Sequence, residues 1–464
     1  MSEILFSPGR RVHFVGIAGS GMSGIASILL GRGVVVTGSD NQEQSSLEPL
    51  RSSGARIFIG HDAKNIEGAQ ILVTSSAIPR NNPEVAAAEK DGLPILGRAE
   101  ALAELLVGRR SIAVAGTHGK TTTSGMLAWT LAAMGEDPSF VIGSKIQGLN
   151  SGSGDGSGDV FVVEADESDG SFMRYRPLGA VITNLELDHV DNFKNLEEVR
   201  TAFQDFVKTV RTFLILCGND AELATLEIPS TLRTVTYGIA EAGKESFDLQ
   251  LSNLLLSPRS SSASISWRGR PLGTLTLSIS GRHNLLNAGA VIATLLELGF
   301  ESQRILTALA SFQGTSRRFE FKGEIKGITV IDDYGHHPTE IQATLAMARS
   351  YMANVGRLVV IFQPHRFSRT AVFHREFATA LTEADLIFLT DIYAASEAPI
   401  EGVTAGLIAS EIPQEKVYYL SNREELISQL ISKMEPGDLV LTLGAGDVTH
   451  LAGEILERLH ERNS

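Results

Sequence analysis

The sequence has little cysteine and no long apolar run. Its one cysteine, Cys217, cannot form a disulfide within the chain, so a disulfide-built secreted fold is excluded and a small buried side chain is expected. The first residues reach Pro8 and two arginines before any hydrophobic stretch develops, which argues against a signal peptide. These absences predict a cytoplasmic protein with no membrane partner.

Positive charge is also scarce. The chain has 40 lysines and arginines against 54 aspartates and glutamates, a net charge of −14, which argues against a nucleic-acid partner because such binding needs a cationic surface. Residues 151–200 alone hold 11 acidic and 4 basic side chains, or half of the net charge. Such a patch is either a solvated face or a cation site.

The length of 464 residues and the alternation of strand-like and helix-like segments predict three α/β domains. Apolar runs at 12–15, 34–37 and 71–74 alternate with helical stretches at 22–30 and 83–90, and new sheets are expected to begin near 109 and 315. The predicted parts are a Rossmann-like domain at 1–107, a central P-loop ATPase domain with a mixed sheet at 108–314, and a Rossmann-like α/β domain at 315–464. Within the central part, the Gly/Ser segment 151–159 is expected to be a flexible surface loop, and 251–280 to form antiparallel strands.

The strongest local motif is a glycine-rich turn between a predicted strand at 111–115 and a predicted helix. Its glycines let backbone N–H groups face phosphate oxygens, its lysine reaches the outer phosphates and its first threonine can bind Mg²⁺. The turn departs from the general P-loop pattern, because Val114 stands where a first glycine is usual, and matches the shorter GTxGKT form. The predicted ATP-binding residues are Gly116, Thr117, His118, Gly119, Lys120, Thr121 and Thr122.

A second glycine loop lies near the start of the chain. It contains Gly19, Ser20 and Gly21, and Asp40 follows about 20 residues later, where a dinucleotide fold places its ribose-binding acid. Taken alone this pattern suggests NAD. Together with the P-loop, it favours an ATP-using enzyme that acts on a nucleotide-activated substrate.

Two strand ends carry groups suited to a metal ion. Glu164 ends the predicted strand at 161–164, and His189 lies between Asp188 and Asp191 after another short apolar strand. A carboxylate at a strand end beside a P-loop commonly contacts Mg²⁺. For His189, a ligand role and a purely structural role are about equally expected from the spacing.

These residues carry a resemblance to the Mur ligases, and among them to the members that act on L-alanine. It rests on segments that span almost the whole chain: HFVGIAGSGMSGIA, SSAIP, GTHGKTTT, EADESD, TNLELDHVD, GRHNLLNAGA, RRFE, DDYGHHPTEI, QPHRFSRT, DIYAASE and GAGD. The resemblance implies an ATP- and Mg²⁺-dependent ligase that joins L-alanine to the lactyl carboxylate of UDP-N-acetylmuramate, in peptidoglycan precursor synthesis, as a monomer or homodimer.

The resemblance also implies residue roles. Thr121, Glu164 and His189 would hold magnesium, and His283, Asn284 and Asn287 would contact the adenine side, with Arg318 and Asp333 closing over the nucleotide. Other residues would bind the UDP-sugar: Gly19, Ser20, Gly21, Ser39, Asp40, His61, Ser75 and Ser76. His336, His337, Arg366 and Arg369 would face the lactyl carboxylate and alanine. Lys208 is the nearest match to a modified lysine of some relatives, and we expect it to be a surface residue.

The implied chemistry is the activation of a carboxylate by ATP as an acyl phosphate, which an amine then attacks. Lys120, Glu164, His189, Arg318, Asp333 and His336 are the candidate catalytic residues. The amine needs a base, which could be His189, His336 or Asp333. Alternatives are a related ligase for a pre-made peptide or another amino acid, an NAD-dependent oxidoreductase, which leaves the P-loop unexplained, and a P-loop binding protein, which leaves the histidines and arginines unexplained.

Overall fold

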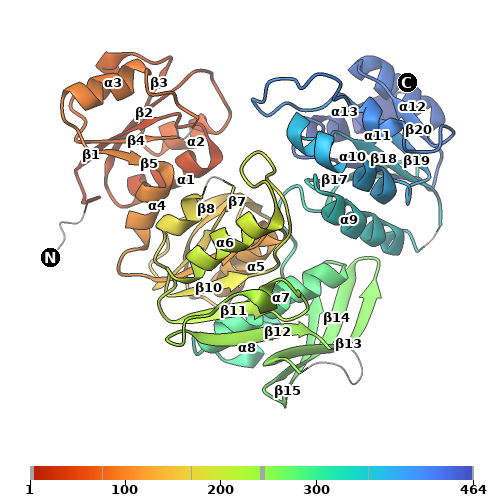
Figure 1. Cartoon of the computed structure of the whole chain (residues 1–464), viewed down its shortest axis with the longest axis horizontal. Helices are drawn as coiled ribbons and strands as arrows, with labels where there is room; N and C mark the ends of the chain where they lie inside the picture. The colour runs from red at the N-terminus through yellow and green to blue at the C-terminus, as the bar shows by residue number, and fades with distance from the viewer. Residues whose placement is uncertain (1–4, 76, 169, 241–245, 354, 462–464) are drawn as a thin grey trace. The chain divides into compact units, whose positions relative to one another are not determined.

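The strands form three sheets in a computed structural model that describes residues 5–75, 77–168, 170–240, 246–353 and 355–461 (Figure 1). The chain divides into two units. Unit 1 comprises Met1–Asn184, Thr201–Tyr237 and Ala290–Ala308, and unit 2 comprises Leu185–Arg200, Gly238–Gly289 and Leu309–Ser464. The α/β class predicted from the alternating pattern is confirmed.

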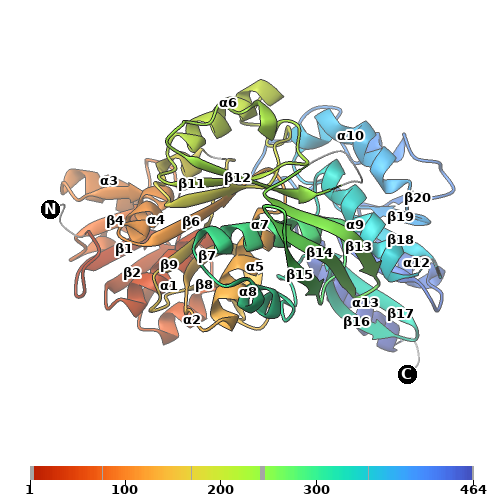
Figure 2. The ribbon, with the colours of Figure 1, turned by 90° about the horizontal axis from the view of Figure 1, so that it is seen from below.

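The first sheet of unit 1 is parallel, with the order β3-β2-β1-β4-β5. Its strands are β1 (Arg11–Val15), β2 (Val35–Asp40), β3 (Arg56–Ile59), β4 (Ile71–Thr74) and β5 (Ile95–Gly97). Its helices are α1 (Ser20–Gly31), α2 (Leu47–Ser52), α3 (Pro83–Lys90) and α4 (Arg98–Leu106), with a 3₁₀ turn η1 at Ala63–Ile66. Helices α1 and α2 cover one face and α3 the other, as Figure 2 shows, so this part has the expected Rossmann-like arrangement.

The second sheet supplies the strands around the P-loop. In unit 1 its order is β12-β11-β10-β6-β9-β7-β8, and only β7 and β8 pair antiparallel, which confirms the mixed sheet. The strands are β6 (Arg110–Ala115), β7 (Ser139–Ile146), β8 (Ser151–Gly154), β9 (Val160–Glu164), β10 (Gly179–Ile182), β11 (Phe213–Cys217) and β12 (Arg233–Ile239). The helices of this part of the chain are α5 (Lys120–Ala133), α6 (Leu196–Val207), α7 (Arg282–Glu297) and α8 (Ser302–Leu309). It also has two 3₁₀ turns, η2 (Ser171–Arg174) and η3 (Leu223–Thr225). Cys217 is buried, as expected, and burial raises the pKa of its thiol.

Unit 2 contains a meander and the third sheet. The meander of β13 (Leu249–Ser257), β14 (Ser260–Trp267) and β15 (Arg270–Leu277) confirms the antiparallel strands predicted from the two-residue alternation. The third sheet has the order β16-β17-β21-β18-β19-β20 and is parallel apart from β16. Its strands are β16 (Glu320–Ile325), β17 (Ile328–Asp333), β18 (Leu358–Phe362), β19 (Leu386–Leu389), β20 (Val417–Tyr419) and β21 (Leu439–Leu443).

Helices cover both faces of this third sheet. One core packs against α9 (Pro338–Tyr351), α10 (Phe367–Leu381) and α11 (Gly406–Ala409), and the other against α12 (Arg423–Lys433) and α13 (Thr449–Glu461). Because both faces are buried, central strands such as β18 are apolar throughout rather than alternating. The loops at the carboxyl ends of these strands are therefore held on a rigid frame.

The Gly/Ser segment 151–159 differs from expectation, because it is ordered rather than a flexible loop. Ser151–Gly154 forms β8, and the Ser157 N–H and hydroxyl both donate to the Asp137 carboxylate at 2.7 and 2.8 Å. A Cβ at Gly156 would lie 2.0 Å from the carbonyl oxygen of Asp137. The small residues of this segment permit close backbone packing, a use that composition alone cannot distinguish from flexibility.

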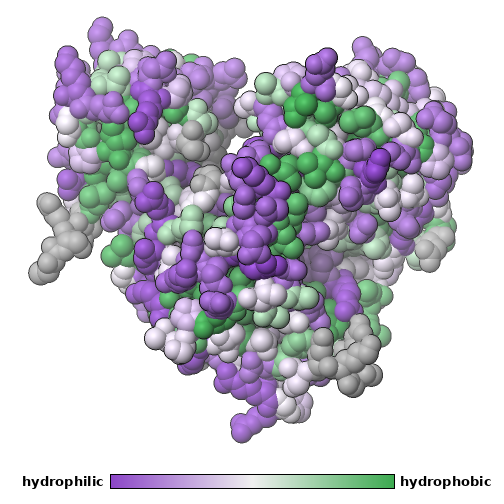
Figure 3. Space-filling model, viewed as in Figure 1, coloured by the Kyte–Doolittle hydropathy of each residue, from purple (hydrophilic) through white to green (hydrophobic). Residues whose placement is uncertain are grey.

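No helix in the described ranges is long and apolar enough to cross a membrane. Hydrophilic residues cover much of the face shown in Figure 3, with smaller hydrophobic groups between them. Apolar atoms form a large share of the surface of most folded proteins.

We predict that Gly156→Ala destabilises unit 1 by on the order of 2 kcal/mol, because the new methyl group overlaps the Asp137 carbonyl and the backbone must shift. A lower urea midpoint by circular dichroism would measure this. Gly453→Ala is the matched control: Gly453 is exposed in α13 with open space at its Cβ, so alanine there should raise stability by roughly 0.5–1 kcal/mol. Equal effects of the two substitutions would contradict the packing explanation.

Candidate active site

The P-loop of unit 1 joins the end of β6 to the start of α5 and is fixed by the end of β10. A Cβ at Gly116, whose φ is +127°, would lie 2.1 Å from the Thr183 hydroxyl, so only glycine fits. The Thr183 hydroxyl donates to the His118 carbonyl at 2.6 Å, and the His118 N–H donates to the Asn184 side-chain oxygen at 2.8 Å. The loop is therefore held in one shape at the N-terminus of a helix, as anion binding requires.

Lys120 lies inside this loop with an anionic partner. Its Nζ is 2.9 Å from a Glu167 carboxylate oxygen and donates to the carbonyls of Gly116 and Thr117 at 2.6 and 3.1 Å. Burial opposes the charged form, but Glu167, Asp166 and Glu164 together raise the pKa of the Lys120 ammonium above its usual range. The lysine is thus a fixed positive charge at the phosphate end of the loop.

Thr121 and Glu164 lie side by side in unit 1. The Thr121 hydroxyl donates to Glu164 Oε1 at 2.7 Å, and the Gly143 N–H donates to Glu164 Oε2, also at 2.7 Å. A hydroxyl and a carboxylate are hard oxygen donors of the kind Mg²⁺ prefers, so these two residues fit the predicted metal. The other predicted ligand, His189, lies in unit 2, where its N–H donates to Asp188 Oδ1 at 2.7 Å.

The N-terminal glycine loop lies between β1 and α1. Gly19 is the residue before α1, and the carboxylate of Asp40, at the end of β2, accepts the Ala18 N–H at 3.0 Å. Asp40 thus holds the loop in which Gly19 and Gly21 stand, as well as lying at the expected position. Ser76 lies outside the described residues, as does the side chain of Ser20.

Ser39 and His61 belong to a buried network centred on Glu84. One Glu84 oxygen accepts from the Ser39 hydroxyl at 2.5 Å and lies 2.9 Å from His61 Nδ1; the other accepts from Asn65 at 2.6 Å and lies 3.7 Å from His13 Nε2. Burial would raise the pKa of Glu84, but His13, Ser39 and Asn65 outweigh it and lower the pKa from 4.5 to about 2. Ser39 is fully buried, and its carbonyl accepts the N–H groups of Gly16 and Ile17 at 2.9 and 3.0 Å, so it holds the start of the glycine loop.

A pocket of about 640 Å³ in unit 1 adjoins Ser75. Arg98 lines it, and a Cβ at Gly21 would lie only 3.0 Å from Arg98 Cδ, so this arginine lies against the glycine loop. Arg174 also lines the pocket, with Glu100 3.9 Å away. A pocket lined by two arginines, one of them against a glycine loop, suits a diphosphate.

In unit 2 the best-buried ion pair joins Arg369 to Asp188. The Arg369 Nε and Nη2 donate to Asp188 Oδ1 at 2.9 and 2.7 Å, and the two side chains are 2% and 4% exposed. Burial would raise the pKa of Asp188, but Arg369 holds it well below its usual range. Arg369 Nη1 also lies 3.1 Å from His365 Nδ1, and because a guanidinium only donates, that nitrogen must accept.

Asp333 ends β17 and lies within electrostatic reach of Arg318. The Asp333 oxygens accept N–H groups of Phe319 and Gly335 at 2.7 and 2.8 Å and the Thr344 hydroxyl at 3.1 Å. Burial raises the pKa of Asp333 to about 6, and Arg318 opposes the rise. Both oxygens of this carboxylate are therefore already engaged in holding loops.

The predicted adenine-side residues lie at the start of α7. Burial, with the charge of Arg318, lowers the pKa of His283 to about 4, so its ring is neutral at pH 7. Asn284 is buried and donates to the Ser280 carbonyl at 2.6 Å, and Asn287 is buried one turn further on. Within unit 2, His283 and Asp333 are thus both within electrostatic reach of Arg318.

His336, His337 and Arg366 differ in how they are held. His336 Nδ1 lies 3.0 Å from the Tyr334 carbonyl, and burial lowers the pKa of its ring to about 4. His337 is 2% exposed, with Nε2 3.2 Å from the Leu187 carbonyl and its ring against Phe373. Arg366 forms ion pairs with Asp191 and Glu397.

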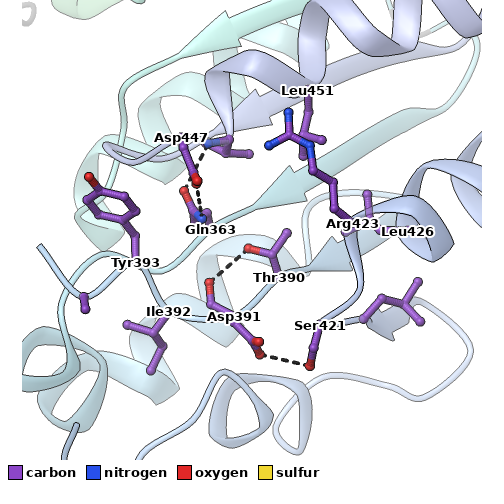
Figure 4. A pocket seen from close by; sticks show the side chains of 13 residues that line it. Gln363, Thr390, Asp391, Ile392, Tyr393, Ser421, Arg423, Leu426, Asp447 and Leu451 are labelled. Atoms are coloured by element: carbon purple, nitrogen blue, oxygen red, sulfur yellow. Dashed lines mark hydrogen bonds between the residues drawn. The ribbon is translucent and has the colours of Figure 1, made fainter. Parts of the chain in front are cut away.

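A second pocket, of about 280 Å³, lies at the carboxyl ends of β18 to β21 (Figure 4). Gln363 donates to Asp447 at 2.7 Å across one wall, and Ser421 donates to Asp391 at 3.1 Å across another. The Tyr393 ring stacks on His365 with a centroid distance of 5.7 Å. None of the predicted site residues lines this pocket.

Several residues of these clusters were not identified from the sequence: Glu84, Arg98, Glu167, Asp188 and His365. Glu167, Asp188 and His365 lie inside the segments that carry the resemblance. Their positions close to predicted site residues are the only sign of a role that the sequence offers. Arg98 and Glu84 had no such signal, because their partners come from distant segments. Lys208 is 60% exposed and pairs with Asp205, which confirms the expected surface position.

Comparisons with known proteins identify the family of this chain. Profiles described as "Mur ligase family, catalytic domain", "Mur ligase middle domain" and "Mur ligase, glutamate ligase domain" match residues 11–110, 114–295 and 317–446. The chain belongs to the Mur ligase family. This Mur ligase is 45% identical over 458 residues, 97% of the chain and 96% of the relative, to the UDP-N-acetylmuramate–L-alanine ligase of Renibacterium salmoninarum.

Further relatives and structures agree with that family. The UDP-N-acetylmuramate–L-alanine ligase of Syntrophus aciditrophicus is 43% identical over 99% of this chain and 96% of its own. The crystal structure of the UDP-N-acetylmuramate–alanine ligase of Thermotoga maritima has a TM-score of 0.81 at 30% identity, covering 97% of this chain and 99% of its own. A murein peptide ligase from Psychrobacter arcticus gives 0.71 at 26% identity, with 97% and 99% covered. The three-domain Mur ligase architecture follows from these matches.

We predict that Glu84→Gln lowers the stability of the Mur ligase at pH 7 by about 1–3 kcal/mol, because a carboxylate with several buried donors is lost. Since folding lowers the Glu84 pKa from 4.5 to about 2, its contribution is complete above pH 4.5 and disappears as the pH falls towards 2. The difference in urea midpoint between the wild type and Glu84→Gln should therefore be larger at pH 7 than at pH 3. Glu89→Gln, at an exposed position of the same helix α3, is the control and should change the urea midpoint at neither pH. A loss of stability in Glu84→Gln that is equal at pH 7 and pH 3 would argue against this network.

We predict that Arg369→Met destabilises unit 2 by about 3 kcal/mol, because Asp188 is left buried without its cation. Adding Asp188→Asn should recover part of the loss, and urea unfolding followed by circular dichroism measures both. Arg375→Met on the same helix is the control, since the Arg375 side chain is 77% exposed. The ion-pair explanation fails if the double variant is no more stable than Arg369→Met.

Proposed function

We propose that this Mur ligase joins L-alanine to the lactyl carboxylate of UDP-N-acetylmuramate with hydrolysis of ATP, in peptidoglycan precursor synthesis. The observation that carries the proposal is full-length similarity, at 43–45% identity, to ligases named for that reaction. Among solved structures, the murein peptide ligase of Psychrobacter arcticus, which represents the alternative of a pre-made peptide, has a TM-score of 0.71 against 0.81 for the alanine ligase of Thermotoga maritima.

The glycine turn between β6 and α5 supports ATP binding. We place the ATP phosphates on Gly116 to Thr122, with Lys120 as the fixed cation, and Mg²⁺ on Thr121 and Glu164, whose oxygens lie 2.7 Å apart. His189 is retained as a further ligand on the resemblance. On the side of adenine and ribose we place His283, Asn284 and Asn287, with Arg318 and Asp333. The metal, when bound, neutralises phosphate charge.

The N-terminal glycine loop and its pocket support a sugar-nucleotide site. Gly19 to Gly21 and Ser75 are the proposed contacts, and Arg98 adds a cation for the diphosphate. Asp40 and Ser39 hold the loop through its backbone N–H groups, and His61 contacts Ser39 and Glu84 next to it. We place the lactyl carboxylate and alanine with His336, His337, Arg366 and Arg369.

Joining a carboxylate to an amine in water is uphill, so the oxygen must become a leaving group. A carboxylate oxygen attacks the γ-phosphorus of ATP, the bond to the β-phosphate oxygen breaks, and ADP leaves with that electron pair. The amine nitrogen of alanine then attacks the acyl carbon, phosphate leaves, and the amide forms. Lys120 and Arg318 stabilise the negative charge that develops in both steps.

The amine of alanine must lose a proton before it attacks. Asp333 has both oxygens occupied by loop N–H groups and a hydroxyl, whereas His336 is neutral at pH 7. The negative charge of an acyl phosphate would raise the proton affinity of a nearby imidazole. His336 is therefore the proposed base.

We predict alanine-dependent phosphate release when ATP, Mg²⁺ and UDP-N-acetylmuramate are present. A coupled phosphate assay with and without L-alanine measures it, and a pre-made peptide that begins with alanine serves as the competing substrate. If phosphate release depends on the peptide and not on alanine, the proposed substrate is wrong. If no amino acid or sugar nucleotide gives turnover, the proposed ligase activity is wrong and a P-loop binding protein becomes the better interpretation.

We predict that Lys120→Ala reduces phosphate release at least 100-fold, because the lysine charge supports the transferring phosphoryl group. Binding of UDP-N-acetylmuramate, measured by calorimetry, should stay within a factor of about two of the wild type, since the sugar nucleotide is placed on a different loop. Loss of both properties would mean that the two sites are misplaced.

A further inference from the structure

The carboxylate of Glu340 contacts His336. It stands in the first turn of α9, and one of its oxygens, Oε2, accepts the backbone N–H of His336 at 3.0 Å and lies 3.4 Å from His336 Nδ1. The two side chains are 11% and 14% exposed. The Arg318 Nη1 lies 3.5 Å from the other oxygen, Oε1.

The surroundings of His336 decide which ring nitrogen carries the proton. Nδ1 faces two acceptors, the Tyr334 carbonyl at 3.0 Å and the Glu340 carboxylate at 3.4 Å. A neutral imidazole with acceptors on one nitrogen places its hydrogen there, so the lone pair is on Nε2. A general base needs such a lone pair, so Nε2 is the atom that can accept a proton.

The carboxylate of Glu340 also fixes the ring in space. The Tyr334 and His365 rings contact the His336 ring edge-on, at centroid distances of 5.3 and 5.6 Å, and restrict its tilt. Arg369 and Asp188 act on it electrostatically from α10 and from the segment before α6, with opposite signs. Glu340 adds the anion on the Nδ1 side that stabilises an imidazolium once it forms.

We propose that Glu340 is a positioning residue that holds His336 with Nε2 free to accept the proton of the incoming amine. In that step an N–H bond of the alanine ammonium breaks, the proton goes to Nε2, and the electron pair stays on nitrogen as the nucleophile. The inference rests on the proposed function and deepens it, because it adds a residue that acts through His336 without touching the substrate.

A simpler role must be separated from this one. An acidic residue in the first turn of a helix stabilises the helix through the backbone N–H groups there, whatever the neighbouring ring does. A structural role of that kind changes the melting temperature and the amount of folded enzyme, but not the rate per folded molecule. Only a positioning role makes the effect of Glu340 depend on the presence of the His336 ring.

The test is a double-mutant cycle with Glu340→Gln, His336→Ala and the double variant, in the alanine-dependent phosphate assay. We expect Glu340→Gln to lower kcat 10- to 100-fold, with the KM for ATP and for UDP-N-acetylmuramate within about twofold of the wild type. In the His336→Ala background the same change should cost less than about twofold, since nothing is left for Glu340 to position. Glu340→Asp, which keeps the charge on a shorter chain, should recover part of the rate.

Glu376→Gln, the same chemical change at an exposed position of α10, is the matched control and should leave kcat unchanged. Losses that multiply in the double variant, or a loss of folding without a loss of kcat, would overturn the proposal. Alanine-dependent turnover of the wild type is measured first, so a failure of the proposed function is seen before the cycle begins and is distinct from a failure of the Glu340 proposal.

Discussion

One interaction recurs at the carboxyl ends of the buried strands: a carboxylate accepts a backbone N–H from an adjoining loop or strand. Asp40 accepts from Ala18, Glu164 from Gly143, and Asp333 from Phe319 and Gly335. A carboxylate removed from water must find donors, and loop amides that would otherwise be unsatisfied supply them. The same contacts therefore satisfy the acids and hold neighbouring segments in place, among them the N-terminal glycine loop that Asp40 fixes.

Short-range signals in the sequence were sufficient for much of the fold. Strand–turn–helix patterns located β6, the P-loop and α5, and two-residue alternation located the β13–β15 meander, because each depends on residues close in the chain. The prediction of a flexible loop at the Gly/Ser segment is wrong because glycine marks both flexible chain and tight backbone contact, and only the position of Asp137 distinguishes them. The partners of Glu84 and Asp188 could not be predicted, since Arg369 lies 181 residues from Asp188.

The acidic excess of residues 151–200 is better understood from its individual partners than from its total. Asp155 pairs with Arg32, Glu167 with Lys120, Asp188 with Arg369 and Asp191 with Arg366. These four cations all come from outside the acidic segment, so the charge that looked local is balanced across the fold. Glu164, in contrast, is met by a hydroxyl and an N–H, which leaves its negative charge available to a cation.

The pairing of Lys120 with Glu167 has a consequence for selectivity among anions. At the proposed ATP site, a phosphate that reaches Lys120 would replace an existing carboxylate partner, so its gain would be the difference between two ion pairs and not the full strength of one. A single free phosphate gains little from such an exchange. A polyphosphate that also reaches the loop N–H groups and the proposed metal site at Glu164 would gain more, so the internal partner would make the loop favour a nucleoside triphosphate over free phosphate.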